Sequence, residues 1–360
     1  MILTEHSICH YLAGKGLIDF AAVVTGNFSV RSKKSRNNNF IVNKEWPGSS
    51  FFIKQASGLD ADKIESISRE AFFYQWINAN DSFRSLLSYL PGFVMHDGSH
   101  HILITKLIHD SVSVQQYYHS ESNADEKTAA AIGELLAASH SCTISETLVS
   151  ENNFFANQPP WVFTIAATAQ HYLNNPATSA SKQAMNIILN NKDFFGQIEA
   201  VTKEWRPNGL VHGDCKLSNF LIASEQVSVQ LIDWELADYG DTAWDVGGVM
   251  QSYLLLWLID DMFSQQMAVK KADLSMVQHS LNSFWNSYAA GMNYAAAENK
   301  AMLEKCTRFC AMKLIHACFE MTNDAETLLP HCAKTLQMAF NIFKSPDDAA
   351  ERLMGIKRLQ

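Results

Sequence analysis

Two short segments near the middle of the chain place acidic and amide side chains directly beside apolar runs. In LVHGDCKLSNFLI, Asp214 and Asn219 stand five residues apart, and in VSVQLIDWELADYG, Asp233 ends a stretch that is expected to be a strand. A carboxylate can accept the proton of a hydroxyl group, and carboxylate and amide oxygens are ligands that suit Mg²⁺. The set therefore fits phosphoryl transfer, with Asp214 as the base and Asn219 and Asp233 as metal ligands.

A cation completes this set. Lys216 lies two residues after Asp214, and its ammonium can offset the negative charge of a γ-phosphate during transfer. The order H-x-D, four residues, Asn and then a metal-binding Asp is also the order in the catalytic loop of kinases. An isolated H-G-D tripeptide often occurs by chance, so the signal depends on Asp214, Asn219 and Asp233 occurring together.

The two segments resemble the H-G-D-x-x-x-x-N and I-D-W/F-[DE] motifs of the aminoglycoside phosphotransferase and choline kinase superfamily, which shares the two-lobed protein-kinase fold. The resemblance extends over nearly the whole chain. It implies ATP and Mg²⁺ as cofactors, a hydroxyl-bearing acceptor, and Asp214 and Lys216 as catalytic residues. It also matches Lys54, in the segment FFIKQ, with the lysine that contacts the nucleotide phosphates, and Glu70 with the ion-pair partner of that lysine.

The same resemblance implies further contacts to the nucleotide. The loop 32–39 lies between two expected strands, where such enzymes close over the phosphates, and Ser35 and Asn38 are its candidate contacts. The loop lacks G-x-G-x-x-G, so its backbone and side chains must replace the usual close approach of glycines to phosphate. The linker that binds adenine through its backbone is expected to include Thr105 and Leu107.

Two residues near Asp214 are expected to support the catalytic loop. The resemblance implies that Asp245, in AWDVG, braces the loop, and His212 is expected to hold it in place. Cys215 is expected to face the packing, not the reaction. Small-molecule kinases of this superfamily often have histidine where this chain has Lys216, and many protein kinases have lysine there, which slightly raises the chance of a peptide or protein acceptor.

The elements that must position the N-terminal residues follow from hydrophobic periodicity and chain breakers. Isoleucine, alanine and aromatic residues recur at helical spacing over 60–78, and five other segments are rich in β-forming residues. These expected strands lie in residues 21–33, 39–46, 49–55, 92–96 and 101–107. The order predicts a five-stranded antiparallel sheet with one packed helix.

Beyond residue 108 the pattern becomes mostly helical. Helices are expected over 124–140, 163–200 and 243–345, and only 209–241 returns to short strands and turns. We therefore predict an α+β fold of the two-lobed protein-kinase type. Residues 1–107 would form a nucleotide-binding lobe and residues 108–360 a helical catalytic and acceptor-binding lobe, with ATP in the cleft between the two lobes.

Composition excludes some function classes. The net charge is −9, whereas a general nucleic-acid binder normally presents a basic face. The most apolar run, Val246–Ile259, is too short to cross a bilayer and predicts a buried helix. Seven cysteines without a C-x-x-C pair suggest free thiols in the cytoplasm, and a metal site at Cys306, Cys310 and His316 is the less favoured reading of that helix.

The identity of the acceptor stays open. The usual substrate of the superfamily is a small-molecule alcohol such as an antibiotic, an amino alcohol or a sugar. The stretch after Asp233 also resembles kinases that phosphorylate Ser or Thr of lanthipeptide or thioamide precursor peptides before phosphate elimination. A third reading is an ATP-binding pseudokinase that acts as a scaffold, although the complete set of site residues speaks against it.

Overall fold

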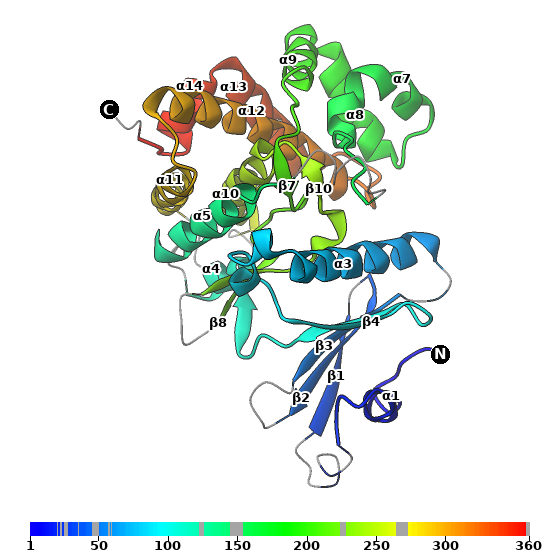
Figure 1. The fold of residues 1–360 in the computed structure, drawn as a ribbon. Helices are drawn as coiled ribbons and strands as arrows, with labels where there is room; N and C mark the ends of the chain where they lie inside the picture. The colour runs from blue at the N-terminus through cyan, green and yellow to red at the C-terminus, as the bar shows by residue number, and fades with distance from the viewer. Residues whose placement is uncertain are drawn as a thin grey trace. The chain divides into compact units, whose positions relative to one another are not determined.

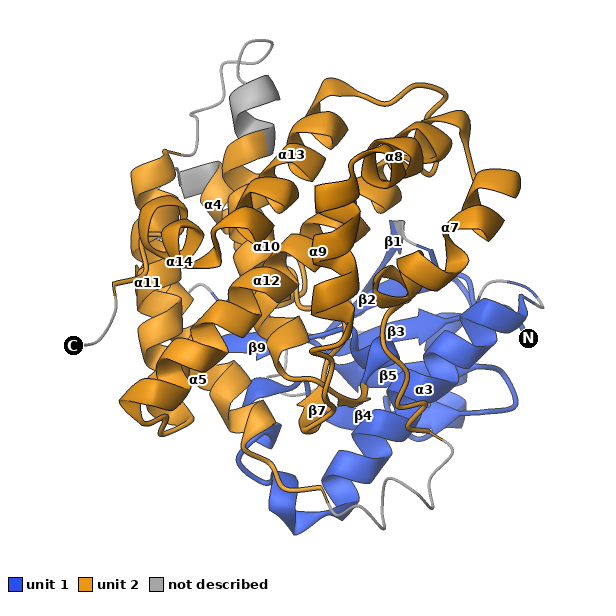
Figure 2. Ribbon diagram, turned by 90° about the horizontal axis from the view of Figure 1, so that it is seen from above, with its two compact units in different colours: residues 1–111, 223–237 blue, residues 112–222, 238–360 orange. Residues whose placement is uncertain are grey.

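The structure is a computed structural model that describes residues 1–19, 21, 24, 28–34, 36–44, 50–56, 58, 60–121, 126–144, 154–223, 228–263 and 273–357. The chain forms two compact units (Figure 2). Unit 1 comprises Met1–Ser111 with Ala223–Ala237, and unit 2 comprises Val112–Ile222 with Asp238–Gln360. The segment 223–237 thus belongs to the same unit as the first part of the chain, although its sequence neighbours lie in the other unit.

Unit 1 is built on a five-stranded antiparallel sheet with the order β1-β2-β3-β5-β4 (Figure 1). Its strands are β1 (Phe28–Lys34), β2 (Asn38–Lys44), β3 (Phe51–Gln55), β4 (Phe93–Asp97) and β5 (Ile102–Lys106). Phe51 and Ile53 of β3 are buried, as expected for a central strand whose alternate side chains face a core. The sheet predicted from the sequence is confirmed.

The N-terminal helix α1 (Ile8–Gly14) packs against this sheet. Ile8 and Leu12 lie four residues apart on one face of the helix and are buried in the same cluster as Val42 of β2. The carboxylate of Asp97, at the end of β4, accepts the hydroxyl of Tyr11 at 2.9 Å. The contacts fix α1 to unit 1.

The long helix α3 (Ala61–Ala79) is the second main element of unit 1. Asp60 caps its N-terminus by accepting the amide of Asp62 at 3.1 Å. Phe73 stacks on Trp234 with ring centroids 4.1 Å apart, so α3 packs against the short helix η4 that follows β9. The smaller elements of unit 1 are η1 (Asp81–Phe83), η2 (Leu87–Tyr89), β9 (Val229–Leu231) and η4 (Trp234–Leu236).

Unit 2 is mostly helical (Figure 1). Its helices are α4 (Val114–Glu121), α5 (Glu126–His140), η3 (Trp161–Thr164), α7 (Ile165–Asn174), α8 (Ser179–Asn190), α9 (Lys192–Thr202), α10 (Ala243–Phe263), α11 (Leu274–Gly291), α12 (Ala296–Met321), α13 (Pro330–Lys344), α14 (Pro346–Asp348) and η5 (Ala349–Leu353). The strands β7 (Gly209–Val211) and β10 (Asp238–Gly240) pair antiparallel. The strands β6 (Ser111–Ser113) and β8 (Phe220–Ala223) contain the residues at which the chain passes from one unit to the other.

Part of the core of unit 2 lies where α10 meets α12. Val246, Val249 and Met250 of α10 are all buried, which confirms the predicted buried helix. A Cβ on Gly247 would lie 2.8 Å from the backbone nitrogen of Cys310, so the absence of a side chain allows α10 and α12 to approach closely. No helix among the described residues is long and apolar enough to cross a membrane.

Candidate active site

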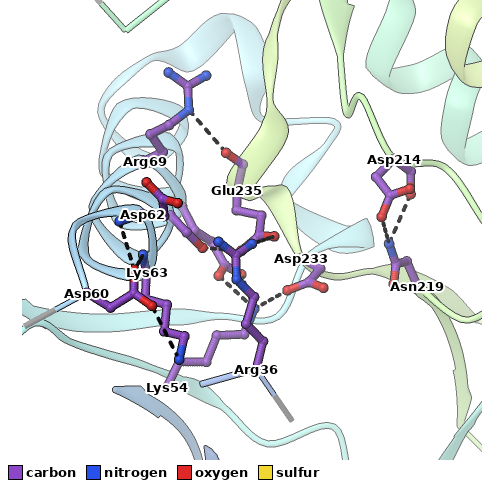
Figure 3. A network of polar contacts seen from close by, with 12 residues as sticks. Arg36, Lys54, Asp60, Asp62, Lys63, Arg69, Asp214, Asn219, Asp233 and Glu235 are labelled. Atoms are coloured by element: carbon purple, nitrogen blue, oxygen red, sulfur yellow. Dashed lines mark hydrogen bonds and ion pairs between the residues drawn. The ribbon is translucent and has the colours of Figure 1, made fainter. Parts of the chain in front are cut away.

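The unit-1 part of the candidate site centres on a buried ion pair between β3 and α3. The ammonium of Lys54 donates to both carboxylate oxygens of Glu70, at 2.9 and 2.7 Å. It also donates to the carboxylate of Asp233, towards which it points in Figure 3. Lys54 is 8% exposed and Glu70 is 2% exposed. One cation thus holds two carboxylates from a helix and a loop that are distant in the sequence.

Burial and charge act in opposite directions on this group. Burial alone would lower the pKa of Lys54, but the carboxylates of Glu70 and Asp233 outweigh it and raise the pKa above its ordinary value. Burial raises the pKa of Glu70 to about 7, and Lys54 opposes that shift. Lys54 therefore stays cationic at neutral pH, as an enzyme that binds nucleotide phosphates requires.

One face of α3 fixes the loop that carries Asp233. Ser66 donates its hydroxyl to the carboxylate of Glu235. Arg69 donates to the carbonyl of Glu235 at 3.1 Å and to the carbonyl of Ala237 at 2.9 Å. Since residues three and four apart share a helix face, the residues of α3 that hold this loop lie beside Glu70. The helix that supplies Glu70 therefore also positions Asp233.

The backbone at Asp233 is in the left-handed region, with φ of 75°. Aspartate tolerates this conformation better than most residues, although not as readily as glycine. Its side chain is 40% exposed, so one of its oxygens contacts Lys54 while the carboxylate remains accessible to solvent. A cluster of three or more His, Cys, Asp or Glu side chains able to hold a metal does not occur among the described residues.

The unit-2 part of the candidate site is the loop between β7 and β8. The amide of Asn219 donates to the backbone carbonyl of Asp214 at 2.9 Å and to its carboxylate at 3.3 Å (Figure 3). The ammonium of Lys216 lies 2.6 Å from the same carboxylate. Asp214, Asn219 and Lys216 are therefore brought together in one loop. Because the Asn219 side chain donates through its nitrogen, its amide oxygen is the atom suited to a metal.

Asp245, in the first turn of α10, accepts hydrogen bonds from the backbone of this loop. Its carboxylate accepts the amide of His212 at 2.6 Å and the amide of Gly213 at 2.9 Å. Nδ1 of His212 in turn accepts the amide of Asp214 at 3.2 Å. Although burial raises the pKa of Asp245, contacts with His140 and His212 outweigh it and lower the pKa below its usual range. Asp245 and His212 therefore both bond to the backbone of the loop, and their role in supporting catalysis remains a prediction.

Three residues that the sequence analysis did not assign also hold the loop. The indole of Trp244 and the ammonium of Lys313 both donate to the carbonyl of Gly213, each at 2.9 Å. His140 lies 3.5 Å from the Asp245 carboxylate and 3.0 Å from the hydroxyl of Tyr288. A signal for Lys313 was present, because it is the charged residue within the apolar run FCAMKLIHACF of α12.

A cavity of about 370 Å³ opens beside Asp214 within unit 2. Polar side chains that line it come from the loop that carries Asp214 and from α4, α10 and α12, and they include Asp214, Lys216, Gln251, Lys313, His316 and Glu320. Leucines of α10 and the loop supply apolar walls. Burial lowers the pKa of His316 to about 4 and raises the pKa of Glu320 above its usual range. The imidazole of His316 is therefore neutral at pH 7.

Of the residues expected to contact the nucleotide, the structure describes all but Ser35. Ser35 lies outside the described residues, whereas Asn38 begins β2 and is partly buried. Thr105 is buried in β5, and the amide of Leu107 donates to the carbonyl of Ser50 at 3.0 Å. An adenine that used the Leu107 amide would have to displace that bond. Their roles as ATP contacts remain predictions.

Cys306 and Cys310 are buried thiols on α12, as expected for small apolar residues on a buried helix face. Burial raises the pKa of both thiols, which keeps them protonated at neutral pH. Cys215 is also buried, and burial raises the pKa of its thiol. None of the three is therefore prepared to act as a nucleophile.

The chain matches the sequence model of a known protein family. The sequence model described as "Phosphotransferase enzyme family" matches residues 27–262. Curated protein sequences contain no match to the chain.

Solved structures show the same fold at low identity. An ethanolamine kinase of Plasmodium vivax has a TM-score of 0.60 at 13% identity, and the match covers 94% of this chain and 88% of that one. A choline kinase of Cryptosporidium parvum has a TM-score of 0.61 at 11% identity, covering 97% and 98%. The ADP-bound aminoglycoside phosphotransferase APH(2'')-Ib has a TM-score of 0.53 at 16% identity, covering 95% and 99%. These likenesses confirm the predicted kinase-like α+β fold.

The family match spans both sequence segments from which the chemistry was inferred, and more than half of the chain. The chain belongs to the phosphotransferase enzyme family and is an ATP-dependent phosphotransferase that acts on a hydroxyl acceptor.

Proposed function

We propose that the enzyme transfers the γ-phosphoryl group of ATP to the hydroxyl group of a small molecule held in the cavity beside Asp214. The observation that carries this proposal is the cavity itself, which has the candidate base in its wall and a volume of about 370 Å³. Ligand pockets for small molecules have volumes of roughly 300–1,000 Å³, so this cavity suits a compact acceptor. A peptide would instead need an extended groove for several residues on each side of the reacting serine or threonine.

The proposed mechanism is a direct in-line transfer without a covalent phosphoenzyme. Asp214 accepts the proton of the acceptor hydroxyl and orients its oxygen for attack. Lys216, which contacts the Asp214 carboxylate at 2.6 Å, offsets the charge on the transferring group. Lys54 neutralises charge on the nucleotide phosphates, and Glu70 keeps its ammonium in place through two hydrogen bonds.

The donor set is suited to Mg²⁺, which is the metal we infer. Mg²⁺ prefers hard oxygen ligands, and enzymes that use nucleotides commonly hold it with one or two protein side chains together with substrate phosphates. Asn219 offers its amide oxygen and Asp233 its partly exposed carboxylate. The two side chains would hold the ion, and when bound it would neutralise phosphate charge. The lack of a larger acidic cluster among the described residues agrees with ligation that is shared with the nucleotide.

The cavity charges and the similar proteins support a proposal for the class of acceptor. Glu320 contributes a carboxylate to the cavity wall, and its recorded ion-pair contact is with Nδ1 of His316, at 3.8 Å. The imidazole is neutral at pH 7, so this pair does not offset the carboxylate charge. Burial raises the pKa of Glu320, and the ammonium groups of Lys216 and Lys313 oppose that shift. Structural neighbours are named as kinases of ethanolamine and choline and as aminoglycoside phosphotransferases. An amino alcohol, an antibiotic or a sugar is therefore the proposed class. The seven cysteines form no disulfide, which suits a reducing compartment such as the cytoplasm.

The decisive experiment measures transfer of label from γ-labelled ATP to two acceptor pools, one of small alcohols and one of peptides that contain Ser and Thr. Wild type, Asp214→Asn and the control Asp81→Asn, at a 93% exposed carboxylate, are compared. We expect label on small alcohols with wild type and with the control, and its loss with Asp214→Asn.

Other outcomes of this experiment would replace the proposal. Label on the peptide pool alone would instead identify a Ser/Thr peptide kinase. Binding of Mg²⁺·ATP without transfer to either pool would favour the scaffold reading.

A further inference from the structure

Lys313 is a buried cation that the proposed mechanism does not use. It lies on α12, is 4% exposed, and has no carboxylate within 4.0 Å of its ammonium among the described residues. Lysine is rarely buried unless it is paired, because removal of its charge from water is costly. A methionine would fill the same space on an apolar helix face without this cost. The position of this lysine therefore requires an explanation in terms of what its ammonium contacts.

The ammonium of Lys313 contacts the residue immediately before the candidate base. It donates to the carbonyl of Gly213 at 2.9 Å, and it lies 3.9 Å from the centroid of the Trp244 ring. The indole nitrogen of Trp244 donates to the same carbonyl, also at 2.9 Å. Two donors from two helices, α10 and α12, thus converge on one oxygen of the catalytic loop.

The opposite edge of the loop backbone is held by Asp245. It accepts the amides of His212 and Gly213, so both the N–H and the C=O of Gly213 are engaged. Gly213 has a φ of 84°, in the left-handed region where glycine is the favoured residue. A glycine without these contacts would have wide conformational freedom, and the peptide plane that leads into Asp214 would be free to rotate.

Burial and neighbouring charges act on Lys313 in opposite directions. Burial lowers its pKa, and the nearby carboxylates of Asp214 and Asp245 act against that decrease. The cation–π contact with Trp244 further favours the charged form in a site shielded from water. Asp214, Asp245 and Trp244 therefore favour the charged form of Lys313, against the effect of burial.

We propose that Lys313 is a positioning residue that fixes the peptide group between Gly213 and Asp214, and with it the direction of the Asp214 carboxylate towards an acceptor in the adjoining cavity. This inference rests on the proposed role of Asp214 as base. Because Lys313 acts on the base and not on ATP, its loss should affect turnover and not the binding of the nucleotide. A displacement of about 1 Å at a catalytic group can cost on the order of 100-fold in rate.

The test compares Lys313→Met, which keeps the packing volume but removes charge and donor, with Lys313→Arg, which keeps both. Lys344→Met is the matched control, because Lys344 makes a cation–π contact with Phe340 at 5.5 Å but lies outside the cavity lining. We expect Lys313→Met to lower kcat by at least about tenfold with KM for ATP unchanged. Lys313→Arg should recover most of that loss, and Lys344→Met should behave as wild type.

Trp244→Phe provides a second measurement if Lys313→Met does not fold, as judged by circular dichroism. It removes one of the two donors to the Gly213 carbonyl and keeps a ring beneath Lys313. It should lower kcat with KM for ATP unchanged. If both variants fold, the effect of the double variant should be smaller than the product of the single effects, because both donors act on one oxygen.

Asp214→Asn in the same assay separates the two hypotheses. If Asp214→Asn is inactive while folded Lys313→Met has wild-type kcat, the positioning role is wrong and the base assignment stands. If Asp214→Asn retains activity, the assignment of Asp214 as the base is wrong, and with it the premise of this inference. Equal loss in Lys313→Met and Lys313→Arg, with both proteins folded, would also overturn the role of the charge.

Discussion

The carboxylate of Asp245 accepts the backbone amide of His212 at 2.6 Å, which links the first turn of α10 to the candidate catalytic loop. The same carboxylate accepts the amide of the next residue at 2.9 Å. Two charge-assisted bonds to backbone groups are stronger than ordinary neutral hydrogen bonds. A buried carboxylate therefore replaces the water that these amides would otherwise require.

Asp245→Asn should destabilise the protein and slow turnover. Asparagine keeps the size of the side chain but presents one oxygen and one NH₂ group, so one backbone amide must face another donor. We expect the free energy of unfolding to fall by about 2–4 kcal/mol, measured by urea denaturation. Asp81→Asn removes an exposed carboxylate and should change it by less than about 0.5 kcal/mol. Equal stability of the two variants would contradict the bracing role.

The sequence predicted the order of the elements well because each carries a local signal. The strands of unit 1 are rich in β-forming residues, and α3 repeats its apolar residues at helical spacing after the capping residue Asp60. The kinase-like α+β fold and the family were therefore within reach of pattern and motif. The sequence did not predict that segment 223–237 belongs to the same unit as residues 1–111, because this depends on contacts of Trp234 with α3 that no local pattern encodes.

The site shows the same limit of sequence reasoning. The motifs predict which residues carry chemistry and that Asp245 and His212 support the loop, but they do not identify the other residues that contact it. Trp244 of α10 and Lys313 of α12 donate to the Gly213 carbonyl. The sequences of these helices do not indicate how close they lie to the loop. The contact of Ser66 with Glu235 also requires a fold to bring the two residues together. Tertiary partners of this kind have no motif, so they follow only from the structure.

Gly248→Ala should impair activity through a steric effect on the catalytic loop. A Cβ at this position would lie 2.6 Å from the carbonyl oxygen of Cys215, the residue after the candidate base. Since real Cβ atoms do not approach so closely, the loop must move, and we expect kcat to fall by at least about tenfold. Transfer to the acceptor under saturating ATP measures the change.

Gly196→Ala is the matched control for this substitution. Nothing lies within 4 Å of the Cβ that would be added at Gly196, in the exposed face of α9. Alanine is the better helix former, so this variant should be more stable by about 0.5–1 kcal/mol and fully active. Wild-type activity in Gly248→Ala would show that the loop tolerates displacement.

His316 should make stability depend on pH in the acidic range. Its pKa is about 4 in the folded protein, against an ordinary value of 6.5, because of burial and the charge of Lys313. The unfolded chain therefore binds a proton at a higher pH than the folded protein does. The contribution of the neutral imidazole to the free energy of unfolding is fully present above pH 6.5. It decreases by about 3 kcal/mol as the pH falls towards 4, at 1.36 kcal/mol per pKa unit.

Urea denaturation of wild type and His316→Asn across this pH range isolates the effect. The difference in free energy of unfolding between the two proteins should be constant above pH 6.5 and change steadily between pH 6.5 and about 4. His279→Asn, at an exposed position of α11, controls for the removal of an imidazole. Parallel curves for wild type and His316→Asn would show that the imidazole titrates as freely when folded as when unfolded.

Asp233→Asn should separate the role of the charge from the conformation of the backbone. Asparagine, like aspartate, tolerates the left-handed φ of 75°, so the loop can keep its shape while the carboxylate is lost. Lys54 retains Glu70 as a partner, and the fold should therefore persist. If Asp233 is a metal ligand, turnover should fall at least about 100-fold and the Mg²⁺ concentration required for half-maximal rate should rise. Removal of Mg²⁺ with a chelator should abolish turnover by wild type, and restoration of the metal should recover it. An Asp233→Asn enzyme with wild-type turnover and unchanged Mg²⁺ dependence would exclude Asp233 from the metal site and leave it only the ion pair with Lys54.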